Sequence, residues 1–121
     1  MSSDSAVVRE VRLAQNQSLF RNVNERVGKV VQQLSAGAPV SFVCECAIAD
    51  CARQIELTHD EYEAIRRDAT HFFVRPDHVF PEVEVVVDDR GPYVIVEKFG
   101  AAGRVAAAAD PRQSQAEPLT A

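Results

Sequence analysis

The sequence predicts an α+β fold, in which a long N-terminal helix packs on a small, mostly antiparallel sheet with a second short helix, a cysteine knuckle and a C-terminal hairpin. The chain lacks proline from Val7 to Ser35 and is rich in helix formers there. Short β-branched segments follow, and a turn-forming stretch at Asp88–Pro92 separates the last two. The 121 residues, of which 46% are hydrophobic, fit one domain with a modest core.

The N-terminal helix is predicted from apolar residues that recur at i, i+3, i+4 and i+7. The members of this stripe, which we expect to be buried, are Phe20, Val23, Val27, Val30, Val31 and Leu34. A weaker stripe precedes it at Val8, Val11 and Ala14, so the segment forms one helix, or two with a break near residues 15–17. Gly37 and Pro39 end it, because glycine caps helices and proline cannot continue them.

Two short strands are predicted on either side of the cysteines, at residues 39–43 and 53–57. A capping box follows, in which the side chains of Thr58 and Glu61 each bond the other residue's amide. It begins a helix that extends to about residue 67, with Tyr62 and Ile65 on one face.

The rest of the chain is predicted as a strand at residues 71–74, a loop at 75–78 and a hairpin of strands 83–87 and 93–98. We expect the acidic residues of the hairpin, Glu82, Glu84, Asp88 and Asp89, to be solvated. The predicted organisation is a disordered N-terminus at 1–6, one domain at 7–100, and an alanine-rich and polar tail at 101–121 that is largely disordered.

Composition excludes several classes of function. The net charge is −5 and no block of Lys and Arg is present, which argues against nucleic-acid binding. No apolar run approaches the roughly 18–20 residues of a membrane span, and the N-terminus lacks the regions of a signal peptide. We therefore expect a cytoplasmic protein with reduced thiols. No nucleophile elbow, phosphate loop or dinucleotide fingerprint is present, so an enzyme is not predicted.

All three cysteines lie within eight residues, in the pattern C-x-C-x4-C formed by Cys44, Cys46 and Cys51. Cys44 and Cys46 follow a predicted strand, where side chains at i and i+2 share one face. The four residues after Cys46 allow Cys51 to fold back toward them. Thiolates are preferred zinc ligands, and structural zinc takes four ligands in a tetrahedron. The pattern predicts a zinc knuckle.

The fourth ligand has to come from another segment. His78 is the first candidate, because it lies in a turn after Pro76 and precedes the hairpin. His71 is the second, and His59, just after a helix N-cap, is expected to face solvent. Asp50, a water molecule, a metal-free thiol cluster and inert buried cysteines stay open as alternatives.

Residues 16–100 resemble a family of small uncharacterised actinobacterial proteins. The matching motifs are the Phe-Val-Cys-Glu-Cys knuckle at 42–46, the Ile-x-Leu-Thr-x-x-Glu-Tyr-Glu stretch at 55–63, a helix at 16–25, and a Pro-Gly-His turn with a hairpin after it. The resemblance implies that His78 is the family histidine, and it implies no activity. Asp77 replaces the glycine of that turn, and Ala69 stands where proline is usual.

Two functions are predicted. The first is a small interaction or regulatory protein with a structural Cys3His zinc site (Cys44, Cys46, Cys51 and His78) and a protein partner, which the N-terminal helix contacts through residues such as Val7 and Val8. The second is a thiol redox sensor in which cysteine oxidation releases the metal. A zinc hydrolase is disfavoured, because three thiolates reduce the Lewis acidity of the metal and no His-x-Glu signature is present.

Overall fold

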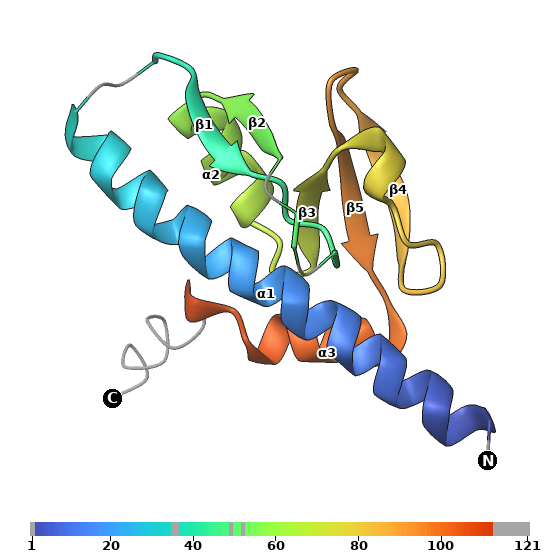
Figure 1. Ribbon diagram of the computed structural model, residues 1–121. Helices are drawn as coiled ribbons and strands as arrows, with labels where there is room; N and C mark the ends of the chain where they lie inside the picture. The colour runs from blue at the N-terminus through green and yellow to red at the C-terminus, as the bar shows by residue number, and fades with distance from the viewer. Residues whose placement is uncertain (1, 35–36, 49, 52, 113–121) are drawn as a thin grey trace, which may run out of the picture.

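The computed structural model describes residues 2–34, 37–48, 50–51 and 53–112. It confirms the α+β fold class (Figure 1). A single helix, α1 (Ser2–Leu34), runs diagonally across the molecule without a break near residues 15–17. The elements that follow are β1 (Val40–Val43), β2 (Gln54–Leu57), α2 (His59–Arg66), β3 (His71–Val74), the 3-10 turn η1 (Pro76–His78), β4 (Glu84–Asp89), β5 (Val94–Lys98) and α3 (Gly100–Ala108).

The strands form two small antiparallel sheets where one was predicted. One sheet is the β1–β2 pair, and the other has the strand order β3-β5-β4 with a bulge between Val86 and Asp88. The chain after β1 lies beside β3, because the Glu45 amide donates to the Phe73 carbonyl at 3.0 Å. This contact brings the cysteine segment next to the strand that leads into η1.

The largest core cluster joins the two sheets through aromatic rings. Phe42 of β1 stacks on Tyr62 of α2 with ring centroids 4.5 Å apart, and Phe73 of β3 meets both rings edge-on. Offset-stacked and edge-on pairs are the favourable arrangements of aromatic rings. The predicted capping box of α2 is confirmed, with Thr58 accepting from the Glu61 amide, and it holds Tyr62 and Ile65 in the buried position.

The buried face of α1 differs from the predicted apolar stripe. Val23 and Val30 are 46% and 56% exposed, whereas Gln17, Arg21 and Asn24 are almost completely buried. The prediction that Val23 and Val30 are buried is therefore wrong, and the described side chains do not include Val31 and Leu34. The polar side of α1 faces the core because its side chains donate hydrogen bonds to carboxylates and backbone carbonyls of the neighbouring segments.

The ends of the fold also differ from the expected boundaries. Helix α1 already begins at Ser2, inside the segment expected to be disordered. Helix α3 packs against α1, with Ala102 buried in one cluster with Leu13 and Ala14 (Figure 1). The folded unit therefore extends beyond residue 100 into the segment expected to be a tail. Residues 113–121 of that tail lie outside the described residues.

Candidate metal centre

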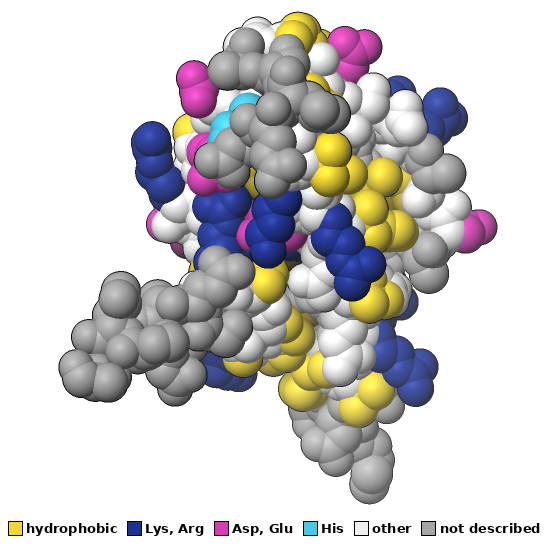
Figure 2. All heavy atoms as spheres, turned by 90° about the vertical axis from the view of Figure 1, so that its left-hand side faces the viewer, with side chains coloured by type: hydrophobic (Ala, Val, Ile, Leu, Met, Phe, Trp, Pro, Cys, Tyr) yellow, Lys and Arg dark blue, Asp and Glu magenta, His cyan; other side chains and the backbone are white. Residues whose placement is uncertain are grey.

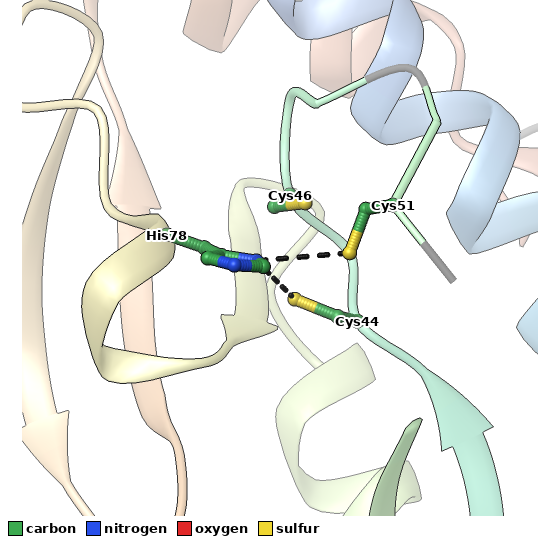
Figure 3. A group of neighbouring side chains, drawn as sticks. All are labelled: Cys44, Cys46, Cys51 and His78. Atoms are coloured by element: carbon green, nitrogen blue, oxygen red, sulfur yellow. Dashed lines mark hydrogen bonds between the residues drawn. The ribbon is translucent and has the colours of Figure 1, made fainter. Parts of the chain in front are cut away.

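The structure brings the four predicted ligands together. The sulfur atoms of Cys44, Cys46 and Cys51 and a ring nitrogen of His78 all lie within 4.8 Å of one another. His78 Nδ1 is 3.5 Å from the Cys44 sulfur and 3.7 Å from the Cys51 sulfur, and Figure 3 shows the four side chains pointing toward one another. Among the described residues, no other group of three His, Cys, Asp or Glu side chains has such a geometry.

The end of β1 positions the first two cysteines. The Cys44 amide donates to the Arg53 carbonyl at 2.9 Å, which continues the pairing of β1 with β2 by one residue. In extended backbone alternate side chains point to opposite sides, so Cys44 and Cys46 share one side and Glu45 takes the other. Both cysteines are buried, at 1% and 0% exposure.

Cys51 and His78 are each delivered by a turn. The Cys51 amide donates to the Ile48 carbonyl at 3.0 Å, which turns the chain back toward Cys46. The His78 amide donates to the Arg75 carbonyl at 2.9 Å in η1, where Pro76 occupies the first turn. Both side chains are only partly buried, so this edge of the cluster faces solvent.

The surroundings of the cluster contribute one amide donor to a sulfur atom and one carboxylate near the imidazole. The Arg75 amide donates to the Cys44 sulfur at 3.3 Å, which stabilises negative charge on that atom. His78 turns Nδ1 to the sulfurs, and its Nε2 lies 3.9 Å from an Asp77 carboxylate oxygen. At this separation the Asp77 carboxylate does not hydrogen-bond the ring.

The three thiols titrate as a group. A hydrogen bond from Cys44, opposed by burial, lowers the pKa of Cys46 to about 5. The same hydrogen bond and burial raise the pKa of Cys44, and burial raises the pKa of Cys51. The raised pKa values favour the protonated thiols of Cys44 and Cys51. A metal ion that binds here displaces those protons.

The donor set fits a tetrahedral metal ion of the zinc type. With zinc–sulfur bonds of about 2.3 Å and a zinc–nitrogen bond of about 2.0–2.1 Å, tetrahedral ligand atoms lie about 3.6–3.8 Å apart. The two distances from His78 Nδ1 to sulfur, 3.5 and 3.7 Å, match this value closely. The described residues therefore include a Cys3His group that could hold a metal ion.

The other candidate ligands lie outside the cluster. His71 on β3 pairs with Glu97 at 3.3 Å and with Asp68 at 3.5 Å. His59 faces Glu63 at 3.7 Å on α2, and Asp50 is exposed. None of these three residues belongs to the group whose ligand atoms converge.

Glu45 was not predicted to matter, yet its buried carboxylate connects the knuckle to α1. It accepts hydrogen bonds from Arg21 at 3.0 Å and from Asn24 at 2.9 Å, and Asn24 also bonds both backbone groups of Val43. Arg21 lies over the Phe72 ring, 3.7 Å from its centroid. The signal in the sequence was the helical spacing of Gln17, Arg21 and Asn24, which puts three polar side chains on one face of α1.

Comparisons of the chain with family models, with curated proteins and with solved structures found no match. No helix among the described residues is long and apolar enough to cross a membrane.

Proposed function

We propose that the chain is a small interaction or regulatory protein built around one structural zinc ion, with Cys44, Cys46, Cys51 and His78 as ligands. The observation that carries the proposal is the convergence of three sulfur atoms and one imidazole nitrogen within 4.8 Å. Sulfur-rich tetrahedral sites select zinc over magnesium, calcium or manganese, which prefer oxygen. We also propose that residues 16–100 are related to the small actinobacterial proteins that they resemble.

A structural role is favoured over catalysis. Four protein ligands leave no open position on a tetrahedral zinc ion, whereas catalytic zinc keeps one for water or substrate. The ligands come from the end of β1, the loop after it and η1, so one ion cross-links segments 34 residues apart in the chain. In a domain of this size, the free energy of metal binding contributes directly to the free energy of folding.

Metal analysis of the purified protein tests the proposal. We expect about one zinc ion per chain, and an intense thiolate-to-metal absorption band when cobalt replaces zinc. Cys46→Ser removes one ligand and is expected to lose the band, while His71→Ala, a matched histidine outside the cluster, keeps both metal and band. An absence of stoichiometric metal in the wild-type protein contradicts the proposal. Retention of metal and an unchanged band in His78→Ala contradicts only the fourth ligand.

A redox sensor is the second candidate, because the Cys51 thiol is partly exposed whereas Cys44 and Cys46 are buried. Hydrogen peroxide and two protons convert two zinc-bound thiolates to one disulfide and two waters, and the zinc ion is released. Zinc release and disulfide content, measured together against added peroxide, separate the candidates. A site that keeps its zinc at mild doses is structural only, and release in step with disulfide formation supports the sensor.

A further inference from the structure

Helix α1 presents an apolar stripe to solvent along most of its length. Its members are about half exposed or more: Val8 at 51%, Leu19 at 63%, Val23 at 46% and Val30 at 56%. Eleven residues make three helical turns to within about 20°, so the steps from Val8 to Leu19 and from Leu19 to Val30 keep one direction. The stripe spans about 33 Å at 1.5 Å per residue.

The same face is basic, although the whole chain has a net charge of −5. Arg12, Arg26 and Lys29 are exposed and lie within about 60° of the line through Val8. No ion pair joins any of these three to a described residue, whereas Arg9 nearby is paired with Glu82 at 2.9 Å. Figure 2, which views the molecule from the left-hand side of Figure 1, shows hydrophobic and basic side chains beside one another on that side.

Among the side chains of α1 that the structure describes, none on this face is acidic. Between residues 6 and 30 the acidic residues are Glu10 and Glu25. Glu10 follows Val8 by two residues and so points about 200° away around the helix. Glu25 is buried, with its carboxylate accepting from Tyr62 at 2.6 Å and from Arg66 at 3.2 Å. The face is therefore complementary to an anionic surface that also carries apolar side chains.

We propose that this face of α1, defined by Val8, Arg12, Leu19, Val23, Arg26 and Val30, docks an acidic amphipathic helix of a partner protein. The inference rests on the interaction role proposed above, and it specifies the partner's binding segment as an acidic amphipathic helix. The partner helix lays its apolar side along the valine and leucine positions, and its carboxylates pair with Arg12 and Arg26.

Two other occupants fit less well. In a second copy, antiparallel pairing about Leu19 places Arg12 opposite Arg26, and parallel pairing places each arginine opposite itself, so like charges meet either way. An anionic lipid surface favours bulky or aromatic residues with basic residues at the flanks. Here Arg12 and Arg26 lie between the apolar residues of the stripe, and the stripe contains no aromatic side chain.

Binding of a synthetic peptide tests the proposal. The probe is a helical peptide of about 22 residues, matched to the 33 Å stripe, with leucines on one face and glutamates flanking them. Its control carries lysine in place of each glutamate. Fluorescence anisotropy with zinc-loaded protein is expected to show binding of the acidic peptide only, weakened by added salt.

Matched variants locate the binding surface. Leu19→Ser and Arg26→Glu are expected to weaken binding of the acidic peptide about tenfold or more. Val86→Ser and Arg104→Glu, exposed residues on β4 and α3, are the controls and leave it unchanged. The zinc content of every protein is measured as well, so that loss of binding in a face variant that keeps its zinc supports this inference. A zinc-loaded wild-type protein that does not bind the acidic peptide counts against this inference alone.

Four results of the binding experiments overturn the proposal. They are equal binding of the acidic and basic peptides, no binding of the acidic peptide at millimolar concentration, unchanged binding in both face variants, and a preference for anionic vesicles that depends on Leu19. A dimer in sedimentation analysis that Leu19→Ser dissolves also contradicts it and assigns the face to a second copy.

Discussion

Glu45 is placed between two candidate metal ligands, and its side chain points away from them into α1. Its carboxylate and the Arg21 guanidinium are both buried, at 0% and 2% exposure. Buried charges require a partner, and removal of one leaves the other unpaired in a low dielectric. Glu45 thus couples the position of the knuckle to the register of α1 without touching the metal site.

Replacement of Glu45 tests this coupling. Glu45→Gln keeps the shape of the side chain but removes the charge opposite Arg21, so we expect the free energy of unfolding to fall by about 3–5 kcal/mol. Urea unfolding measures it, with Glu56→Gln, an exposed change on β2, as the control. A Glu45→Gln protein within about 0.5 kcal/mol of wild type contradicts the role of the pair.

Glu25 gives a second prediction at the scale of the residue, because its carboxylate accepts from three side chains. Burial alone would raise its pKa, but hydrogen bonds from Arg112, Tyr62 and Arg66 lower the pKa to about 2. A carboxyl group with a depressed pKa stabilises the fold above its unfolded pKa, and this stabilisation is lost as the pH falls toward the folded pKa.

We therefore expect Glu25→Gln to remove part of the loss of stability that wild type shows between about pH 4.5 and pH 2. Urea midpoints measured across that range test it. Because Glu25 lies outside the Cys3His group, acid affects that group alike in wild type and variant, and the difference between their two pH profiles isolates Glu25. If the urea midpoints of wild type and Glu25→Gln fall in parallel over this pH range, the assigned role of Glu25 is contradicted.

At the scale of the element, α1 has a polar buried face and an apolar exposed one over its middle turns. Among its described side chains, the buried apolar ones are Leu13 and Ala14, which pack with Ala102 of α3, and the partly buried Val27 packs against the main core cluster. In the next turns of the helix, Gln17, Arg21 and Asn24 donate hydrogen bonds to the knuckle and to β4. Over the described part of α1, apolar packing by a few residues is therefore combined with a row of polar contacts to the rest of the fold.

A pair of substitutions distinguishes the two faces. Leu13→Ala is expected to cost about 2–5 kcal/mol of stability, because it opens a cavity in a buried cluster. Val30→Ser is expected to stay within about 0.5 kcal/mol of wild type, since its side chain is 56% exposed. Thermal or urea unfolding measures both. A larger loss for Val30→Ser than for Leu13→Ala contradicts the orientation of α1.

Local signals made much of the fold predictable. The capping box at Thr58, the alternation in β2 and the turn of the β4–β5 hairpin depend on neighbours in the sequence, and the structure has each of them. The grouping of the four candidate ligands was predictable for the same reason, because the cysteine spacing is local and the chain has only three histidines.

The burial of charged residues was not predictable in this way. Glu84 was expected to be solvated, yet it is 2% exposed and accepts from Lys98, from Gln17 at 2.9 Å and from the Phe80 amide at 2.8 Å. The partners are distant in sequence, so no local pattern marks the pairing. The prediction of which side of α1 faces the core was wrong for the same reason. The spacing of apolar residues in α1 does not show that carboxylates from distant segments bind its polar side.

At the scale of the whole molecule, two kinds of connection hold the small sheets and α1 together. The buried Arg21–Glu45 ion pair connects α1 to the segment after β1, and Gln17 of α1 donates to Glu84 of β4, whose carboxylate also pairs with Lys98 of β5. The Cys3His group connects β1 to η1 (Figure 3). We propose that a metal ion makes the connection between β1 and η1.

Removal of the metal is expected to loosen one region more than the rest. Treatment with a strong chelator lowers the melting temperature, because ligation free energy is folding free energy. Hydrogen exchange is expected to rise first at the amides of Cys44 and Arg75, which bond the Arg53 carbonyl and the Cys44 sulfur. Exchange that rises equally in β3, β5 and β4, or a melting temperature unchanged by the chelator, contradicts this view.

X-ray absorption at the zinc edge tests the central claim most directly, because it reports the identity and distance of the atoms bound to the metal. The account predicts three sulfur neighbours at about 2.3 Å and one nitrogen neighbour at about 2.0–2.1 Å. A shell made mainly of nitrogen and oxygen, or a purified protein without a zinc edge, contradicts it.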